Sequence, residues 1–351
     1  MHQRKHRMIN ANGVRIHAVE EGEGPLVVLI HGFPESWYSW RHQLTALANA
    51  GYKAVAIDQR GYGSSSKFRV QEAYRIGPLV KDILGVIDAY GVEKAFIVGH
   101  DWGAPVAWTF AWLHPERCSG VVGVSVPFAD RALICLPGNT FGEKRPRDHH
   151  VELAGPGKVF YQDYFSEQSG ILEEIEADLR TWLKGLIYTV SGEAVGAAVR
   201  SLNGAVIDPV DAIRHGPLCM PKGAKLMDSF VYPETMPAWM TNADLDFFAS
   251  EFERSGFSGP LSFYHNIDAD WHDLESQAGK PLTPPAVFIG GEFDVGTIWG
   301  AEAIKAAPRR IQNYHGTHMV AGSGHWIQQE YPEQTNRLLL GFLDDVKRGK
   351  S

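Results

Sequence analysis

The chain has 351 residues, 44% of them hydrophobic and 21% charged, which is enough apolar material for one large core or for a core domain with an insertion. A net charge of −8 excludes a general electrostatic attraction to nucleic acids or anionic membranes, and no apolar run is long enough for a membrane-spanning helix. The three cysteines are widely spaced and form neither a disulfide framework nor a metal-ligand pattern, so we expect a protein of the reducing cytoplasm.

The first 125 residues alternate short apolar runs with stretches of helical pattern. The basic opening MHQRKHR is followed by no apolar segment, and we expect a frayed start there and not a signal peptide. Continuous apolar runs at 26–30, 52–58, 94–100 and 119–127 predict strands that are buried on both faces of a parallel sheet. This β-α-β-α order predicts a doubly wound α/β sheet whose sites lie at the carboxyl ends of its strands.

The pattern changes between residues 129 and 280. SGILEEIEADLRTWLKGLIYTV and PAWMTNADLDFFASEFERSG predict helices in this segment, and its part 135–157 is predicted to be an irregular loop. Strand patterns return with PPAVFIGGEFD and THMVAGSGH, and IQQEYPEQTNRLLLGFLDDV predicts a closing amphipathic helix. We therefore predict a core domain made of 1–128 and 281–351, with 129–280 inserted as a mainly helical lid.

The sequence GHDWG fits the Gly-x-nucleophile-x-Gly turn, which presents one reactive side chain between a strand and a helix. Gly99 and Gly103 allow the close backbone approach that this turn needs. Where many enzymes carry a serine, this chain has Asp101, an anion at neutral pH that can attack carbon without a base. A plain helix cap is the alternative role for Asp101, but the two glycines and the partners downstream indicate a nucleophile.

An acid and a base are expected downstream, in the order nucleophile, acid, histidine. GSGHWIQQ supplies His325 on the loop after the last predicted strand, and FIGGEFDVG supplies Asp294 at the end of the strand before it. Glu292 is too close to the end of that strand, and Asp130 remains a variant position for the acid. The histidines that this chain order sets aside are His31, His100 and His114.

The stretch LIHGFPES places a His-Gly pair directly after a buried strand. The backbone N–H groups of Phe33 and Trp102 are the predicted donors of an oxyanion hole, and a cis bond before Pro34 would help to aim the loop. Residues near the catalytic positions, together with two from the lid, are candidates for the walls of an apolar pocket, with core packing as the alternative for each: His31, Pro34, Trp326, Met236 and Trp239.

Together, HGFPESWYSWRHQ, DQRGYGSSS, GHDWG and the late GHW resemble the epoxide hydrolases of the α/β-hydrolase superfamily, over nearly the whole chain. The resemblance implies the α/β-hydrolase fold, with a mostly parallel eight-stranded sheet flanked by helices and an inserted helical lid. It also implies that an aspartate attacks an epoxide carbon to form an ester, which water then hydrolyses to a diol. In that family two lid tyrosines hold the epoxide oxygen: FYQDYFSEQSG gives Tyr161, with Tyr164 as the alternative, and GPLSFYHNID gives Tyr264.

These residue types suit an epoxide, whose strained carbon needs back-side attack and whose departing oxygen needs a proton. Asp101 supplies the attack, and phenols, which titrate near pH ~10, stay protonated and can supply the proton. His325, oriented by Asp294, is needed only afterwards, to take a proton from the water that attacks the ester. The scheme needs no metal and no organic cofactor. Its partners are a small hydrophobic epoxide and water, and the resemblance is compatible with a homodimer through the lid.

Two other functions stay open. A haloalkane or fluoroacetate-type dehalogenase also uses an aspartate nucleophile, a histidine base and an acid. It is disfavoured because Phe33 has no side-chain donor for a halide, because Trp102 stands where fluoroacetate dehalogenases place an arginine, and because both tyrosine motifs are present. A non-catalytic ligand-binding protein on the same scaffold is the other alternative. Such proteins usually lose part of the machinery, which this chain retains.

Overall fold

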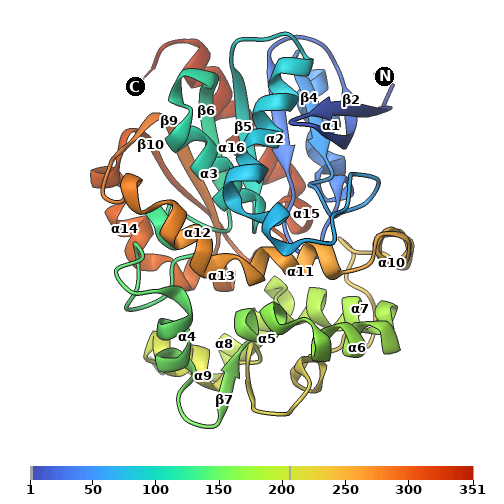
Figure 1. Cartoon of the computed structure of the whole chain (residues 1–351), viewed down its shortest axis with the longest axis vertical. Helices are drawn as coiled ribbons and strands as arrows, with labels where there is room; N and C mark the ends of the chain where they lie inside the picture. The colour runs from blue at the N-terminus through green and yellow to red at the C-terminus, as the bar shows by residue number, and fades with distance from the viewer. Residues whose placement is uncertain (1–2, 205–206, 351) are drawn as a thin grey trace.

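The computed structural model describes residues 3–204 and 207–350. At its centre is one eight-stranded sheet with the spatial order β1-β2-β4-β3-β5-β6-β9-β10 (Figure 1). The β1–β2 and β2–β4 pairs are antiparallel, and the other neighbouring pairs are parallel. The strands are β1 Lys5–Ala11, β2 Val14–Glu21, β3 Leu26–Ile30, β4 Lys53–Ile57, β5 Ala95–His100, β6 Cys118–Val124, β9 Leu282–Gly291 and β10 Ile311–Val320.

Helices cover both faces of this sheet, with α2 and α3 packed on one face and α1 and α16 on the other. The helices outside the β6–β9 connection are α1 Arg41–Asn49, α2 Ile76–Ala89, α3 Gly103–Leu113, α13 Val295–Trp299, α14 Ala301–Arg310, α15 Ile327–Glu330 and α16 Pro332–Lys347. The short 3-10 helices are η1 Trp37–Trp40, η2 Gln71–Tyr74, η3 Pro115–Arg117, η4 Asp130–Ala132, η5 Leu226–Ser229 and η6 Glu275–Gln277. The predicted eight-stranded, mostly parallel sheet flanked by helices is confirmed.

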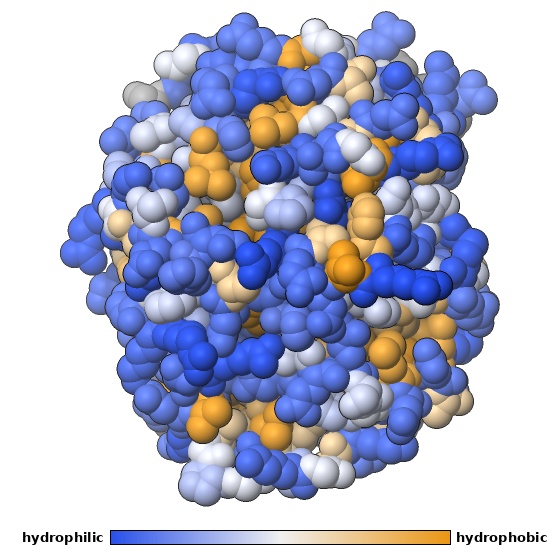
Figure 2. Space-filling model, viewed as in Figure 1, coloured by the Kyte–Doolittle hydropathy of each residue, from blue (hydrophilic) through white to orange (hydrophobic). Residues whose placement is uncertain are grey.

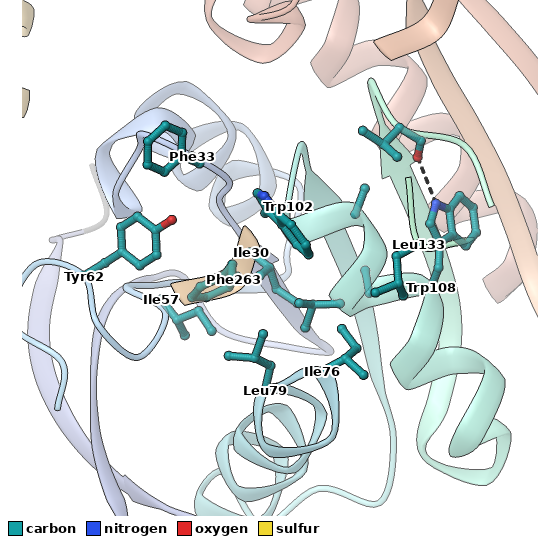
Figure 3. Packing of buried hydrophobic residues seen from close by; sticks show 14 of the residues in the cluster. Ile30, Phe33, Ile57, Tyr62, Ile76, Leu79, Trp102, Trp108, Leu133 and Phe263 are labelled. Atoms are coloured by element: carbon teal, nitrogen blue, oxygen red, sulfur yellow. Dashed lines mark hydrogen bonds between the residues drawn. The ribbon is translucent and has the colours of Figure 1, made fainter. Parts of the chain in front are cut away.

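Buried apolar residues pack beneath the carboxyl ends of β3 and β4, where the loops that follow these strands begin. The β3 run LVVLI is buried at every position, as expected for a central strand of a parallel sheet. In Figure 3, Ile76 and Leu79 of α2 lie beside Ile30 and Ile57, the last residues of the two strands. Trp102 packs in the same cluster, so the loops that follow these strands begin at buried, closely packed residues.

The connection between β6 and β9 is mainly helical, as predicted for the lid, and it also holds a small antiparallel sheet of β7 Lys158–Phe160 and β8 Cys219–Pro221. The predicted helical stretch 169–190 is two helices, because the side chain of Asp178 caps the second one by accepting from the N–H of Thr181 at 3.0 Å. The helices of the connection are α4 Pro146–Ala154, α5 Tyr161–Glu167, α6 Ser169–Ala177, α7 Leu179–Thr189, α8 Gly192–Ser201, α9 Pro209–His215, α10 Asn242–Ser255, α11 Ser258–His265 and α12 Ile267–Asp273.

Two expectations about irregular segments are wrong. Residues 5–7 of the basic opening begin β1, and the Asn12–Gly13 turn joins β1 to β2 with φ values of 50° and 73°, as in a tight hairpin. Polar residues fit β1 because it is an edge strand with an exposed outer side. Within 135–157, α4 begins with Pro146 at its first position, where the missing N–H costs nothing.

The closing helix is also divided. Pro332 starts α16 anew after α15, so the predicted stretch 327–346 forms a short and a long helix. The face of the molecule in Figure 2 is largely polar, with apolar residues scattered between charged ones. Among residues 3–204 and 207–350, no helix combines the length and the apolar character that crossing a membrane requires.

Candidate active site

Asp101 stands on the turn between β5 and α3, at the carboxyl end of the sheet. Its φ is 49°, a left-handed conformation that is rare outside glycine and that turns the side chain out of the line of the strand. A Cβ on Gly99 would lie 2.0 Å from the carbonyl oxygen of Gly103, and a Cβ on Gly103 would lie 2.1 Å from that of Ile30. Only glycine fits at both positions, so the turn has the shape that the sequence pattern predicts.

His325 lies between two carboxylates. Its Nδ1 is 2.9 Å from Oδ1 of Asp294, and its Nε2 is 3.3 Å from Oδ2 of Asp101. Asp294 is fully buried on the turn after β9, where it also accepts hydrogen bonds from the N–H groups of Gly296 and Thr297 and from the Thr297 hydroxyl. These donors fix the plane of the Asp294 carboxylate, which in turn orients the imidazole ring toward Asp101.

The charges of these three residues depend on one another. Burial alone would lower the pKa of His325, but the hydrogen bonds and charges of Asp101 and Asp294 raise that pKa well above its ordinary value. Burial raises the pKa of each carboxyl group, and the hydrogen bond and charge of His325, with further donors, outweigh this and leave both pKa values below the ordinary range. At neutral pH the site therefore holds an imidazolium between two carboxylates.

The loop after β3 donates to the proposed nucleophile. The N–H of Phe33 donates to Oδ1 of Asp101 at 2.7 Å, and the peptide bond between Phe33 and Pro34 is cis. A Cβ on Gly32 would lie 2.3 Å from the same Oδ1, so this loop approaches the carboxylate as closely as a glycine allows. The backbone of Trp102 follows Asp101 directly and caps α3, which places the second predicted oxyanion donor at a helix N-terminus.

A carboxylate that we did not single out from the sequence braces this loop. Oε1 of Glu35 accepts from the N–H of Gly32 at 2.8 Å and lies 2.6 Å from Nδ1 of His100, while Oε2 accepts from Nε2 of Gln328 at 3.1 Å. Nε2 of His100 lies 2.7 Å from the carbonyl oxygen of His325. His100 therefore joins the loop after β3 to the loop of His325 and does not face the cavity.

A cavity lies between Asp101 and the lid, and two tyrosines from the lid line it. Tyr161 from α5 and Tyr264 from α11 have ring centroids 6.1 Å apart; Tyr264 is buried and Tyr161 is half-buried. Burial raises the pKa of each phenol above its ordinary value, so both stay protonated at neutral pH. His325 lines the same cavity. The remaining lining residues are apolar or aromatic: Phe33, Phe165, Leu186, Val190, Leu218, Val295 and Trp326.

Tyr164, the alternative to Tyr161, faces elsewhere. Its hydroxyl donates to Oε2 of Glu174 at 2.8 Å, and the residue is not part of the cavity wall. Glu174 also accepts from the N–H groups of Leu226 and Met227, so this cluster ties lid segments together. The geometry favours Tyr161 over Tyr164 as a donor to a bound molecule.

Most of the pocket candidates named from the sequence do not line the cavity, and only Trp326 does. His31 is buried in the core, where its Nε2 accepts from the N–H of Gln59 at 3.1 Å. Trp239 donates its Nε1 to the carboxylate of Glu193 at 3.1 Å, on the outer part of the lid. The other two candidates that lie outside the cavity wall are Pro34 and Met236.

Asp130, the variant position for the acid, is not beside the histidine. Its carboxylate pairs with Arg310 and accepts from the N–H of Gly279 at 2.8 Å. A residue that we missed, Ser125 directly after β6, places its Oγ 3.0 Å from Nδ1 of His325. The position of Ser125 after a predicted strand, in VGVSVP, was the sequence signal that could have indicated it.

Over residues 3–204 and 207–350, no three His, Cys, Asp or Glu side chains are grouped to hold a metal ion.

Comparison with known proteins identifies the class first. The family model for the alpha/beta hydrolase fold matches residues 25–145. The chain is 68% identical to Epoxide hydrolase B of Mycobacterium tuberculosis, over 97% of this chain and 99% of that protein. It is also 36% identical to Epoxide hydrolase A of the same organism, over 97% of this chain and 98% of that one.

The solved structures agree. An epoxide hydrolase from an endophytic Streptomyces matches with a TM-score of 0.88 at 44% identity, covering 98% of this chain and 96% of its own. Epoxide Hydrolase A from Mycobacterium thermoresistibile matches with a TM-score of 0.84 at 36% identity, covering 97% and 98% of the two chains. The chain therefore belongs to the epoxide hydrolases of the α/β-hydrolase superfamily, and the family predicted from its motifs is confirmed.

Proposed function

We propose that this protein hydrolyses small hydrophobic epoxides to vicinal diols through an ester formed on Asp101. The observation that carries the proposal is the arrangement around one carboxylate. Phe33 N–H donates to one oxygen of Asp101, His325 approaches the other, and two lid phenols line the cavity that the carboxylate faces. Residues 129–280 act as the lid that supplies both phenols and closes the apolar cavity.

In the first step, an oxygen of Asp101 attacks one carbon of the epoxide from the back and the carbon–oxygen bond opposite breaks. The low pKa of Asp101 keeps it ionised, so no base is needed for this attack. The departing oxygen is held by Tyr161 and Tyr264 and takes a proton from a phenol, which is protonated because its pKa is raised. The product of this step is a hydroxyalkyl ester of Asp101.

Formation of the ester changes the state of the base. Esterified Asp101 carries no charge, so one of the two carboxylates that raise the pKa of His325 is lost. The imidazolium then gives its proton to the phenolate that the first step left, which restores the phenol and leaves His325 neutral. Neutral His325, oriented by Asp294, then takes a proton from water, and the hydroxide attacks the carboxyl carbon of Asp101. The N–H groups of Phe33 and Trp102 stabilise the resulting oxyanion. When this intermediate collapses, the bond between the carboxyl carbon and the substrate oxygen breaks. The departing alkoxide takes the proton of the newly added hydroxyl group, which releases the diol and returns the carboxylate of Asp101.

Dehalogenation is less well supported because the donors at the cavity wall are phenols, which suit an oxygen that must be protonated, and because Phe33 offers no side-chain N–H to a halide. A silent binding protein would not need the triad geometry described above. Neither alternative has an observation of its own in its favour.

The variant His325→Gln tests the proposal. It should form the ester and fail to release it, so intact-protein mass spectrometry after mixing with an aromatic epoxide should show the mass of one added substrate. Asp101→Asn should show no added mass. His215→Gln is the matched control, because His215 is an exposed lid histidine that bonds only a local carbonyl. Parent-rate turnover by His325→Gln would contradict the two-step scheme.

A further inference from the structure

The loop that carries His325 is seated directly on one part of the lid, residues 187–192. The N–H of His325 donates to the carbonyl oxygen of Val190 at 3.0 Å, and Nε1 of Trp326 donates to that of Ile187 at 2.7 Å. A Cβ on Gly324 would lie 2.1 Å from the backbone nitrogen of Gly192. The two backbones therefore touch with no side chain between them, and a shift of either one moves the other.

One carboxylate holds this contact together. Oε2 of Glu330, at the end of α15, accepts from the N–H of Gly324 at 2.9 Å and from the N–H of Gly192 at 3.0 Å. Oε1 of the same residue accepts from the N–H of Trp326 at 3.0 Å. Glu330 thus binds the residue before His325, the residue after it, and the first residue of α8 in the lid.

The environment of Glu330 is costly for a negative charge. Burial, with a smaller contribution from the neighbouring carboxylate of Glu193, outweighs the three N–H donors and raises the pKa of Glu330 to about 7. A carboxylate kept in such a place, with all its bonds directed to backbone on both sides of His325, indicates a role in placing that residue.

We propose that Glu330 is a positioning residue that sets the catalytic distance of His325 and couples it to the seating of lid segment 187–192. The inference rests on the proposed function, because it assigns His325 to the hydrolysis of the ester. The ring of His325 is held at Nδ1 by Asp294, and the backbone N–H groups of the residues on either side of it are held by Glu330. Loss of the Glu330 contacts leaves the ring partner intact and lets the base drift from the ester carbon.

Glu330→Gln tests the inference. Its amide keeps one acceptor oxygen and presents an NH₂ group to an N–H donor, so at least one of the three bonds is lost. In single-turnover experiments with an aromatic epoxide, we expect hydrolysis of the ester to slow about 10-fold or more, since a misplaced catalytic group costs rate steeply, while ester formation changes less than about 3-fold. Covalently loaded protein should therefore accumulate.

Glu292→Gln is the matched control. Glu292 follows β9 and accepts at 2.8 Å from the N–H of Gly322, which lies in the loop that carries His325. This bond is exposed at the surface and lies further from His325 along the loop. We expect both steps of this variant to match the parent. Equal slowing of ester formation and ester hydrolysis in Glu330→Gln would indicate a structural role only and would overturn the inference, as would parent rates for both steps.

Two further measurements cover a Glu330→Gln protein that does not fold. Glu330→Asp keeps the charge but shortens the reach, and it should show the same selective slowing. In the parent enzyme, amide hydrogen exchange should be slower at Gly324 and Trp326 than at Gly322, and equal exchange at the three amides would overturn the inference. If the parent enzyme itself forms no ester, the proposed function fails first, and the exchange result still decides whether Glu330 clamps the loop.

Discussion

Asp294→Asn replaces a buried carboxylate by an amide of the same shape. The parent side chain receives four hydrogen bonds: Oδ1 from His325 and the Gly296 N–H, and Oδ2 from the Thr297 N–H and hydroxyl. The Asn amide has a single acceptor oxygen, so it can replace only one of the two carboxylate oxygens of Asp294. If the NH₂ group of the new Asn points toward Thr297, it faces the two hydrogen-bond donors of that residue. If the NH₂ group points toward His325, it donates to Nδ1 and the ring proton moves to Nε2. Nε2 must be unprotonated for His325 to act as the base, so this orientation blocks the base.

The size of the effect follows from this geometry. In a serine-hydrolase triad the same change costs about 10⁴-fold in kcat because the histidine adopts the wrong tautomer, which corresponds to roughly 5 kcal/mol. Here Oγ of Ser125 lies 3.0 Å from the same Nδ1 and can still accept a hydrogen bond from its N–H group. We therefore expect hydrolysis of the ester to slow by about 10²–10⁴-fold. The unmatched buried donor should cost about 1–3 kcal/mol in the free energy of unfolding.

Rapid-quench mixing of excess enzyme with an aromatic epoxide separates the two steps. The fraction of protein carrying the ester and the yield of diol are read by mass spectrometry at each time point. The Asp294 variant should form the ester at close to the parent rate and release it slowly. The reasoning is refuted if hydrolysis keeps the parent rate, or if ester formation slows as much as hydrolysis does.

The two phenols and the charge of the nucleophile give further predictions. Tyr161→Phe and Tyr264→Phe should each slow ester formation by about 10²-fold or more, and the double variant should nearly stop it; normal single-turnover rates in the double variant would exclude these tyrosines as donors. Asp101→Asn should lower the pKa of His325, because one of the two carboxylates that raise it loses its charge, and an unchanged imidazole titration by NMR would contradict the coupling. The stability that the charged His325 contributes is present below pH ~6.5 and lost as the pH rises through its folded pKa, so this loss should begin at lower pH in Asp101→Asn when unfolding is followed by denaturant.

Much of the fold was predictable because local patterns and tertiary structure agree. The continuous apolar run of β3 predicts a strand that is buried on both faces. The glycines around Asp101 predict a close backbone approach, because a side chain at those positions would collide with neighbouring backbone atoms. The β1–β2 hairpin was missed although Asn12–Gly13 is a strong hairpin signal, because the exposed residues of an edge strand resemble a disordered start. Helix α4 was missed because its surroundings are rich in glycine, proline and charge.

The catalytic residues could be predicted because their order along the chain is constrained, whereas the residues of the cavity wall depend on how the lid packs. Asp101, Asp294 and His325 come together because strand order brings their loops to one edge of the sheet. Part of the apolar wall comes from the lid, where the spacing of apolar residues is the same whether they face a cavity or the core. For this reason Met236 was named and Leu186 was not. The contacts of Glu330 could not be predicted, because its partners are backbone N–H groups, which nearly every residue type provides.

The central claim is that a protein carboxylate supplies the oxygen added in the first turnover. A single turnover of an aromatic epoxide with excess enzyme in ¹⁸O-water, followed by mass spectrometry of the diol, tests it most directly. The account predicts an unlabelled diol in that turnover, with one ¹⁸O atom left in the peptide that contains Asp101. A diol labelled in the first turnover would mean direct attack by water and would contradict the account.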